Sequence, residues 1–200
     1  MIWYNHKCIK IGEAALLVRR LLCIMLAAML AFCFFSCGKE QGAEEIFVLA
    51  MDEIKAFDLR DFAEHIAESS ASYFDFAVSR EKTLLHYGKE ALAALYAGIS
   101  YEITGVGDGF LDVKINSFDF EKITRYVENS YALGTGGSRA EILASLLKSE
   151  SFSSVYGKTY EIKVKFASEA GKVKFFFDSA ENYDFVTSLG LAEMINLMAK

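Results

Sequence analysis

Two pairs of segments in this chain alternate strictly between apolar and polar residues, and this alternation constrains the fold more than any other feature. The first pair covers residues 99–103 and 111–115, with a glycine-rich turn at 105–109 between them. The second pair covers residues 160–166 and 173–177 and is also separated by a turn. Such pairs are typical of β-hairpins, because successive side chains of a strand point to opposite faces. One apolar and one polar face predict an antiparallel sheet that is wetted on one side and covered by helices on the other.

Segments with the helical spacing of apolar residues precede the first hairpin. Residues 45–56 carry an apolar stripe that Phe57 extends, and Asp58 is placed to cap a second, short helix. We expect a polar and aromatic connection over residues 69–79 and a third helix over residues 80–97. These helices are the natural cover for the apolar face of the sheet.

A helical insert separates the two hairpins. Asp119 is placed to cap its first helix, which ends before a glycine-rich stop at 134–137, and Ser138 is placed to cap its second helix. The C-terminal region returns to helix, with Ser179 as a candidate cap and a break at Gly190. The order of elements predicts an α+β fold: a curved antiparallel sheet of about four strands packed on N-terminal helices, with a helical insert and a C-terminal helix.

The N-terminal region has a different pattern. Leu21 to Phe35 is fifteen residues without a charge, directly preceded by Arg19 and Arg20. As a helix this stretch spans roughly 22 Å, which is short of the ~30 Å hydrocarbon core of a bilayer. A basic start, a short apolar stretch and a small residue at its end are typical of a cleaved signal peptide. The alternative is an uncleaved anchor lengthened by residues 14–18, an extension that the two arginines interrupt.

The segment Phe34-Phe35-Ser36-Cys37-Gly38 ends this stretch. It resembles the lipobox of bacterial lipoproteins, although Phe34 stands where leucine is usual. In that family the cysteine thiol receives a diacylglyceryl group and signal peptidase cuts before it. The resemblance therefore implies that Cys37 becomes the lipid-bearing first residue of the mature protein, and two acyl chains hold a protein firmly on a membrane. The alternative for Cys37 is a buried or incidental thiol.

These expectations divide the chain into a lipoprotein signal peptide (1–36), a lipidated tether (37–44) and a single domain (45–200) outside the cytoplasmic membrane. The other cysteines fall in the first segment: Cys8, Cys23 and Cys33. The mature chain would then have no internal disulfide. Residues 1–36 carry a net charge of +3 and the whole chain −6, so the mature part carries −9. An acidic domain disfavours binding to the phosphates of nucleic acids.

Three stretches of the domain carry a second resemblance: the helix pair broken at Phe57-Asp58, the strand-to-helix passage over 113–123, and the hairpin over 160–178 with its terminal helix. Together they are similar to small bacterial lipoproteins of the Gram-positive type whose domain has the NTF2-like, cystatin-like superfold. The resemblance implies a cone-shaped α+β domain. That superfold hosts both enzymes and binding proteins, so it does not by itself assign an activity.

In such a cone, the inward aromatic residues Tyr101, Tyr160 and Phe175 are candidates to line a cup for a small apolar ligand. Filling of the core is the alternative that we favour. Enzymes on this superfold usually place a carboxylate inside the cone, where it serves as an acid or base. The acidic residues of the predicted strands all fall on the polar face: Glu102, Asp112 and Glu161. This placement argues against catalysis.

The remaining candidates for chemistry are isolated. His65 and His86 are predicted to lie on the surface, with His65 paired to Asp61 four residues earlier. Two separate histidines without a cysteine partner do not make a transition-metal site. The glycine-rich segments 105–109 and 134–138 lack the ending of a phosphate-binding P-loop. The second opens a helix beside a basic residue, which makes it a weak candidate for an anion.

We therefore expect a membrane-tethered, extracytoplasmic lipoprotein with a non-catalytic binding or interaction domain and without a cofactor or a metal. The expected partners are the membrane, through the lipid anchor, and a small apolar ligand or an envelope protein, but not nucleic acid. The alternative is a small NTF2-like enzyme, a hydrolase or an isomerase, that acts outside the cytoplasm. A carboxylate that points into an open cone would favour the enzyme.

Overall fold

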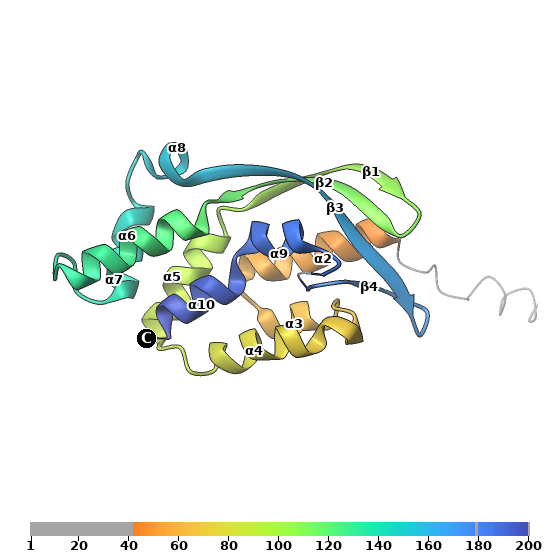
Figure 1. Cartoon of the computed structure of the whole chain (residues 1–200), viewed down its shortest axis with the longest axis horizontal. Helices are drawn as coiled ribbons and strands as arrows, with labels where there is room; N and C mark the ends of the chain where they lie inside the picture. The colour runs from red at the N-terminus through yellow and green to blue at the C-terminus, as the bar shows by residue number, and fades with distance from the viewer. Residues whose placement is uncertain (1–41, 179, 200) are drawn as a thin grey trace, which may run out of the picture. The chain divides into compact units, whose positions relative to one another are not determined.

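The computed structural model describes residues 42–178 and 180–199 (Figure 1). The predicted signal peptide, Cys37 and most of the predicted tether lie outside these residues. The helices are α2 (Ala43–Ala56), α3 (Leu59–Ala63), the 3-10 helix η1 (Glu68–Ser70), α4 (Ala71–Glu81), α5 (His86–Tyr96), α6 (Phe120–Ala132), α7 (Arg139–Leu147), α8 (Phe152–Tyr156), α9 (Tyr183–Leu189) and α10 (Leu191–Met198). The strands are β1 (Ser100–Gly107), β2 (Phe110–Phe118), β3 (Gly157–Glu169) and β4 (Lys172–Phe175).

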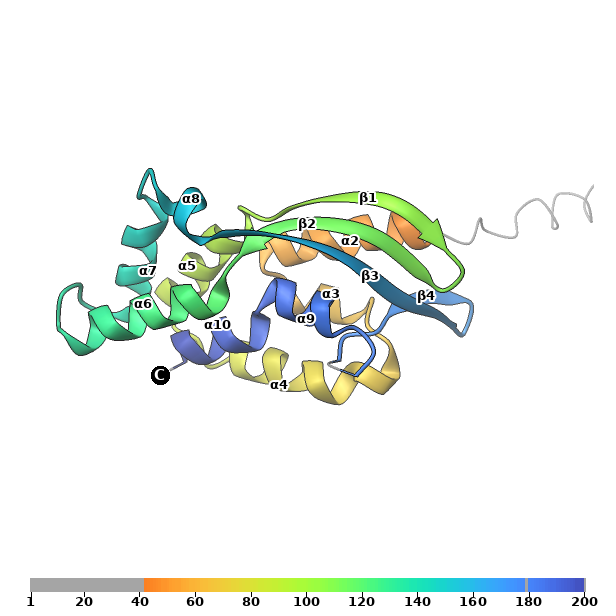
Figure 2. The same cartoon turned by 45° about the horizontal axis from the view of Figure 1, so that its top comes forward.

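The four strands form one antiparallel sheet in the order β1-β2-β3-β4, so both predicted hairpins are confirmed. The long strand β3 has two partners. Its residues 157–165 pair with β2, and its residues 166–169 pair with β4. Because β3 changes partner part-way along its length, the sheet curves, as Figures 1 and 2 show.

Helices cover one face of this sheet, and α2 and α9 lie beneath it in both views (Figures 1 and 2). The inward residues of the two central strands are buried: Leu111, Val113, Ile115, Ile162 and Val164. Their outward neighbours are exposed or half-buried, as expected for a sheet wetted on one side. The predicted α+β architecture is therefore confirmed, including the N-terminal helices, the helical insert and the C-terminal helix.

The turn from α2 to α3 depends on one strained residue. Phe57 ends α2 with a φ of 56°, in the left-handed region that favours glycine. Its ring is buried and stacks on Tyr96 of α5 with 5.4 Å between ring centroids, which offsets the strain. Asp58 caps α3 as predicted, because its carboxylate accepts a hydrogen bond from the N–H of Asp61.

The two helices of the insert begin at the predicted caps. The carboxylate of Asp119 accepts a hydrogen bond from the N–H of Lys122 at 3.0 Å. Ser138 and Glu141 form a reciprocal capping box at the start of α7. Both signals are contained within four consecutive residues, which is why the sequence alone reveals them.

The prediction for residues 69–79 is wrong, because most of that segment forms α4. Phe74 and Ala77 are spaced three residues apart and both are buried. The ring of Phe74 contacts those of Phe62 and Phe177, at 5.2 and 5.5 Å between centroids. These aromatic partners, which are distant in the sequence, stabilise the helix. Its own residues do not show a clear apolar stripe, so the sequence alone does not predict it. The third predicted helix is correspondingly shorter and begins at His86.

The free side of β4 is covered by the segment after α3. The N–H of Phe175 donates to the carbonyl of His65 at 2.8 Å, and the N–H of Ala67 donates to the carbonyl of Phe175 at 2.9 Å. Ile66 and Phe175 form an isolated parallel bridge. This cover protects an edge that would otherwise expose unpaired backbone groups.

Among the described residues, no helix combines the length and the apolar character needed to cross a bilayer.

Candidate functional site

The three predicted cup residues lie on the inner face of the sheet. Tyr101 and Tyr160 stand on either side of Ile115 in one row across β1, β2 and β3. Phe175 lies on β4 and is buried. The structure therefore places all three residues on the apolar side, as the alternation predicts.

Phe47 of α2 fills the space between two of these residues. Its ring centroid lies 5.6 Å from that of Tyr101 and 5.5 Å from that of Phe175, both in edge-to-face contacts. Tyr160 points to another neighbour, since its hydroxyl donates to the carbonyl of Phe118 at 3.4 Å. Phe175 is thus part of the buried core, and Tyr101 and Tyr160 are partly buried and pack against it, as the core-filling alternative expects.

Burial raises the pKa of Tyr101 above its ordinary value, and the nearby charge of Asp52 raises it further. The phenol is therefore neutral near pH 7 and does not act as a base there.

The outer face of the sheet carries the polar and charged side chains in rows that follow the strand register. One row contains Ser100, Asn116 and Thr159, which are joined by hydrogen bonds of 3.3 and 2.9 Å through the amide of Asn116. The next row places Lys114 of β2 between Glu102 of β1 and Glu161 of β3. Such rows are the usual units of side-chain interaction across a sheet.

A third row contains Asp112 and Lys163, whose charged groups form an ion pair of 2.9 Å. The ammonium group of Lys163 also lies 3.9 Å from the centroid of the Phe110 ring. Beside Asp112, β1 has a bulge, and the hydroxyl of Thr104 donates to the carbonyl of Asp112 at 3.2 Å.

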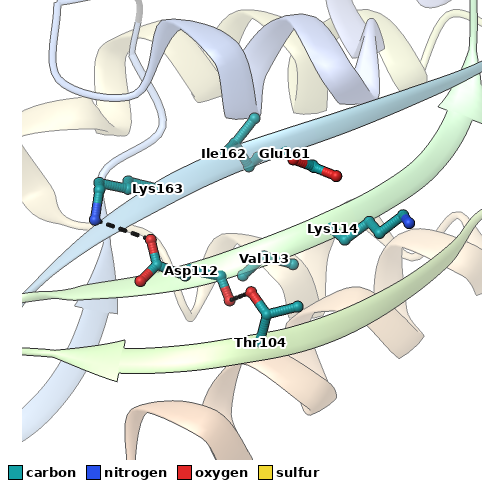
Figure 3. A pocket seen from close by; sticks show the side chains of 7 residues that line it. All are labelled: Thr104, Asp112, Val113, Lys114, Glu161, Ile162 and Lys163. Atoms are coloured by element: carbon teal, nitrogen blue, oxygen red, sulfur yellow. Dashed lines mark hydrogen bonds and ion pairs between the residues drawn. The ribbon is translucent and has the colours of Figure 1, made fainter.

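The second and third rows surround an open hollow of about 440 Å³ on the outer face (Figure 3). It is lined by Thr104, Asp112, Val113, Lys114, Glu161, Ile162 and Lys163. The acidic residues Asp112 and Glu161 lie here, and Glu102 lies in the same row as Lys114, so their predicted position on the polar face is confirmed. The hollow offers two ammonium and two carboxylate groups to a ligand from solvent.

The sequence analysis missed this hollow. Each strand shows only its own alternating charges, and the register that brings Lys114 and Glu161 together joins residues far apart in the chain. The signal present in the sequence is an acidic residue followed two positions later by a lysine on each strand: Asp112 and Lys114 on β2, and Glu161 and Lys163 on β3.

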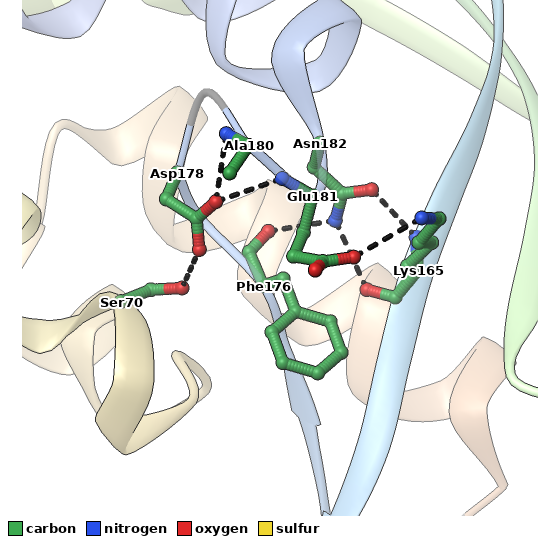
Figure 4. Close-up of polar contacts among 7 residues, drawn as sticks. All are labelled: Ser70, Lys165, Phe176, Asp178, Ala180, Glu181 and Asn182. Carbon is green, nitrogen blue, oxygen red and sulfur yellow. Dashed lines mark hydrogen bonds and ion pairs between the residues drawn. The ribbon is translucent and has the colours of Figure 1, made fainter.

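A second polar cluster, also missed by the sequence analysis, connects the segment after β4 to β3 and η1 (Figure 4). The amide of Asn182 accepts from the N–H of Lys165 at 2.9 Å and donates to the carbonyls of Lys165 and Phe176 at 3.0 and 2.7 Å. Lys165 is the last residue of β3 that pairs with β2. Asn182 therefore satisfies backbone groups at the point where β3 changes partner.

Asp178 holds the other half of this cluster. Its carboxylate accepts from the hydroxyl of Ser70 at 2.7 Å and from the N–H groups of Ala180 and Glu181 at 2.9 and 2.8 Å. Partial burial favours the protonated form, but these hydrogen bonds and the charge of Lys165 lower the pKa of Asp178 below its ordinary value. Ser70 is buried and also accepts from the N–H of Phe177 at 3.0 Å. We infer that this cluster has a structural role, because it holds the segment after β4 against η1.

The prediction for His65 is wrong and the one for His86 is confirmed. The ring nitrogen Nε2 of His65 lies 3.1 Å from a carboxylate oxygen of Glu53 on α2, and 17% of the side chain is exposed. Because the turn at Phe57 folds α3 back toward α2, His65 lies beside Glu53 and not beside its predicted partner, Asp61. His86 is 78% exposed and faces Glu90 on the same helix.

The glycine-rich segment before α7 does not leave an open anion site. The carboxylate of Glu141 accepts from the N–H of Ser138 at 2.7 Å and so occupies the position that an anion would take. Hydrogen bonds from the backbone and hydroxyl of Ser138 lower the pKa of Glu141. Arg139 is engaged by Glu128 at 3.2 Å and lies over the Tyr131 ring.

Among the residues that the structure describes, no group of three or more histidine, cysteine, aspartate or glutamate side chains is arranged to hold a metal ion.

No family model matches the chain, and neither a curated protein nor a solved structure is significantly similar to it.

Proposed function

We propose that the chain is an extracytoplasmic lipoprotein, held on the cell membrane by lipid on Cys37, and that its domain is a non-catalytic binding module. The ligand site in this proposal is the hollow on the outer face of the sheet. The observation that carries the proposal is the division of the sheet into two faces. Core side chains fill the inner face, and the charged side chains of the two central rows lie on the outer face: Glu102, Asp112, Lys114, Glu161 and Lys163.

The alternative of an NTF2-like hydrolase or isomerase is less well supported. Such an enzyme needs an acid or base in a sheltered apolar cavity, where its pKa can be matched to the reaction. The carboxylates of Glu102, Asp112 and Glu161 lie on the outer face instead. The buried residues of the same strands are aromatic or aliphatic except Ser117. This arrangement suits recognition of a ligand more than proton transfer.

The lipid anchor is supported by the lipobox-like segment and by the length of the chain that follows it. Four residues lie between Cys37 and Gly42, the first described residue. The five steps from Cys37 to Gly42 span at most about 18 Å when the chain is fully extended. The lipid would therefore keep the start of α2 close to the membrane, and the ligand of the domain is expected in the cell envelope.

The anchor is tested by incorporation of radiolabelled palmitate in a bacterial host that acylates lipoproteins. We expect label in the wild type and none in Cys37→Ala. Cys33→Ala is the matched control and is expected to keep the label, because that thiol lies within the segment to be removed. Mass spectrometry of the mature protein should find acylated Cys37 as its first residue. Equal labelling of the wild type and Cys37→Ala, or a mature chain that begins at Met1 without lipid, would contradict the proposal.

A further inference from the structure

The two charged rows of the outer hollow differ in one respect. In the third row, Asp112 and Lys163 are directly opposite and their charges meet at 2.9 Å. In the second row, Lys114 is directly opposite both Glu102 and Glu161. Yet within residues 42–178 and 180–199, no ion pair or hydrogen bond engages any of these three side chains. The second row therefore presents one free ammonium group between two free carboxylates.

Strand spacing sets the separation between these opposite charges. Neighbouring strands lie about 4.8 Å apart, and long side chains can spread by a few ångströms beyond that. The amino and carboxyl groups at the ends of an extended dipeptide are about 6 Å apart by backbone dimensions. A small molecule with one positive and one negative group can thus reach Lys114 and Glu161 together.

The charge balance of the hollow favours the same class of ligand. With Glu102 of the second row, the site carries two lysines and three acidic residues, so its net charge disfavours a pure anion. The ammonium group of Lys114 between the two carboxylates disfavours a pure cation. The mature chain is strongly acidic as a whole, which further disfavours a pure anion. A zwitterion is complementary to both signs at once.

We propose that the second row binds a small zwitterion, whose anionic group meets Lys114 and whose ammonium group meets Glu161 or Glu102. This inference rests on the proposed function, because it names the ligand class of the same outer hollow. Two sources share this chemistry: a short peptide with free ends and a zwitterionic lipid headgroup. The contacts are charge-assisted hydrogen bonds at an exposed site, so binding is weak and depends on salt.

The test uses the lipidated protein extracted in a non-ionic detergent and labelled with ¹⁵N-lysine. Alanylalanine is titrated with the Lys114 amide signal as the readout. N-acetyl-alanylalanine, which keeps only the carboxylate, and alanylalanine amide, which keeps only the ammonium, are expected to bind about tenfold more weakly, the loss of one charged contact. Glycerophosphoethanolamine, whose primary ammonium group can donate hydrogen bonds, is the second probe and stands for a lipid headgroup. Tighter binding of this probe assigns a lipid headgroup, and tighter binding of alanylalanine assigns a peptide.

Variants locate the site. Lys114→Gln and Glu161→Gln are each expected to weaken binding of the better probe about tenfold. Lys148→Gln and Glu150→Gln make the same changes of charge at exposed positions outside the sheet and are expected to stay within about twofold. Far-ultraviolet circular dichroism of all four variants should match the wild type.

Three results would overturn the zwitterion site: no shift of the Lys114 signal with either probe, equal binding of the blocked dipeptides, or equal losses in the Gln variants and their controls. Palmitate labelling of Cys37 is a separate measurement. If Cys37 is labelled and the protein binds no zwitterion, the lipoprotein proposal stands and the zwitterion site is excluded. If the protein is not labelled but binds alanylalanine through Lys114, the zwitterion site stands and the lipid anchor is excluded.

Discussion

At the scale of single residues, the side chains that matter most for the fold are polar ones that satisfy distant backbone groups. Asn182 is almost fully buried and makes three hydrogen bonds to the backbone of residues 165 and 176. Ser70 and Asp178 are 108 residues apart in the chain and share a bond of 2.7 Å. Together these groups hold the chain in place as it leaves β4 for α9.

Asp178 should make the stability of the protein depend on pH. Its pKa is lowered in the folded state, so its contribution to the free energy of unfolding is full above the ordinary value near 3.8. That contribution is lost as the pH falls through the lower, folded-state pKa. In urea titrations, the difference in free energy of unfolding between the wild type and Asp178→Asn is expected to be largest near pH 6 and to shrink steadily below pH 4.

Asp184→Asn is the matched control, since Asp184 is exposed and engages in no hydrogen bond or ion pair described in the structure. As a substitution on the surface, it is expected to change the free energy of unfolding by less than about 0.5 kcal/mol near pH 6. A difference for Asp178→Asn that grows on acidification would contradict the assigned direction of the shift.

At the scale of elements, the junction between α9 and α10 depends on a single glycine. Gly190 ends α9 and begins α10 with a φ of 53°. A Cβ placed there would overlap the ring of Phe120 and lie 2.9 Å from its Cβ. The close approach of α10 to α6 therefore requires both the left-handed backbone and the absence of a side chain.

Gly190→Ala is expected to lower the free energy of unfolding by about 2–4 kcal/mol, because left-handed strain and overpacking add together. Gly134→Ala separates the two effects. Gly134 also has a positive φ, of 67°, but nothing lies within 4 Å of a Cβ built on it. That variant should lose only about 1 kcal/mol in the same urea titration. Equal losses in both variants would show that contact with Phe120 is not important.

The two edges of the sheet are treated differently. The segment around Ile66 covers β4. Among the described residues, no strand pairs with the outer side of β1. This strand contains a bulge between Ile103 and Gly105 and carries the charge of Glu102. Bulges and charges are common ways to prevent a strand edge from pairing with another chain.

At the scale of the whole domain, one aromatic network links elements from both ends of the described chain. The ring of Phe177 contacts those of Phe62 and Phe185, and Phe185 in turn contacts Phe47. These rings belong to α3, to the segment after β4, to α9 and to α2. Because the same buried cluster includes residues of the insert and of α10, the domain has one core.

A single core predicts one cooperative unfolding transition for the mature protein. Thermal transitions followed by far-ultraviolet and near-ultraviolet circular dichroism are expected to coincide. Trp3 lies in the predicted signal peptide, so tyrosine and phenylalanine would supply the near-ultraviolet signal. A near-ultraviolet transition that precedes the far-ultraviolet one would instead indicate an intermediate that has lost core packing but keeps its secondary structure, and would contradict a single cooperative transition.

Several features of this protein follow from its sequence alone. The alternation along both hairpins predicts the strands and the face that each residue occupies, because the side-chain period of a strand is fixed. Asp58, Asp119 and Ser138 mark helix starts, because a cap acts on a backbone group within three residues of itself. These signals are local, and the structure confirms them.

Only the tertiary structure decided the contacts between residues far apart in the chain. Helix α4 depends on Phe62 and Phe177, and the partner of His65 is Glu53 and not Asp61. Lys114 lies opposite Glu161 through the pairing of β2 with β3. No local pattern specifies these neighbours, because they follow from how the helices pack on the sheet and from where β3 changes partner. The alternation of apolar and polar residues determined which face of the sheet each side chain occupies. Packing determined which side chains become neighbours on that face.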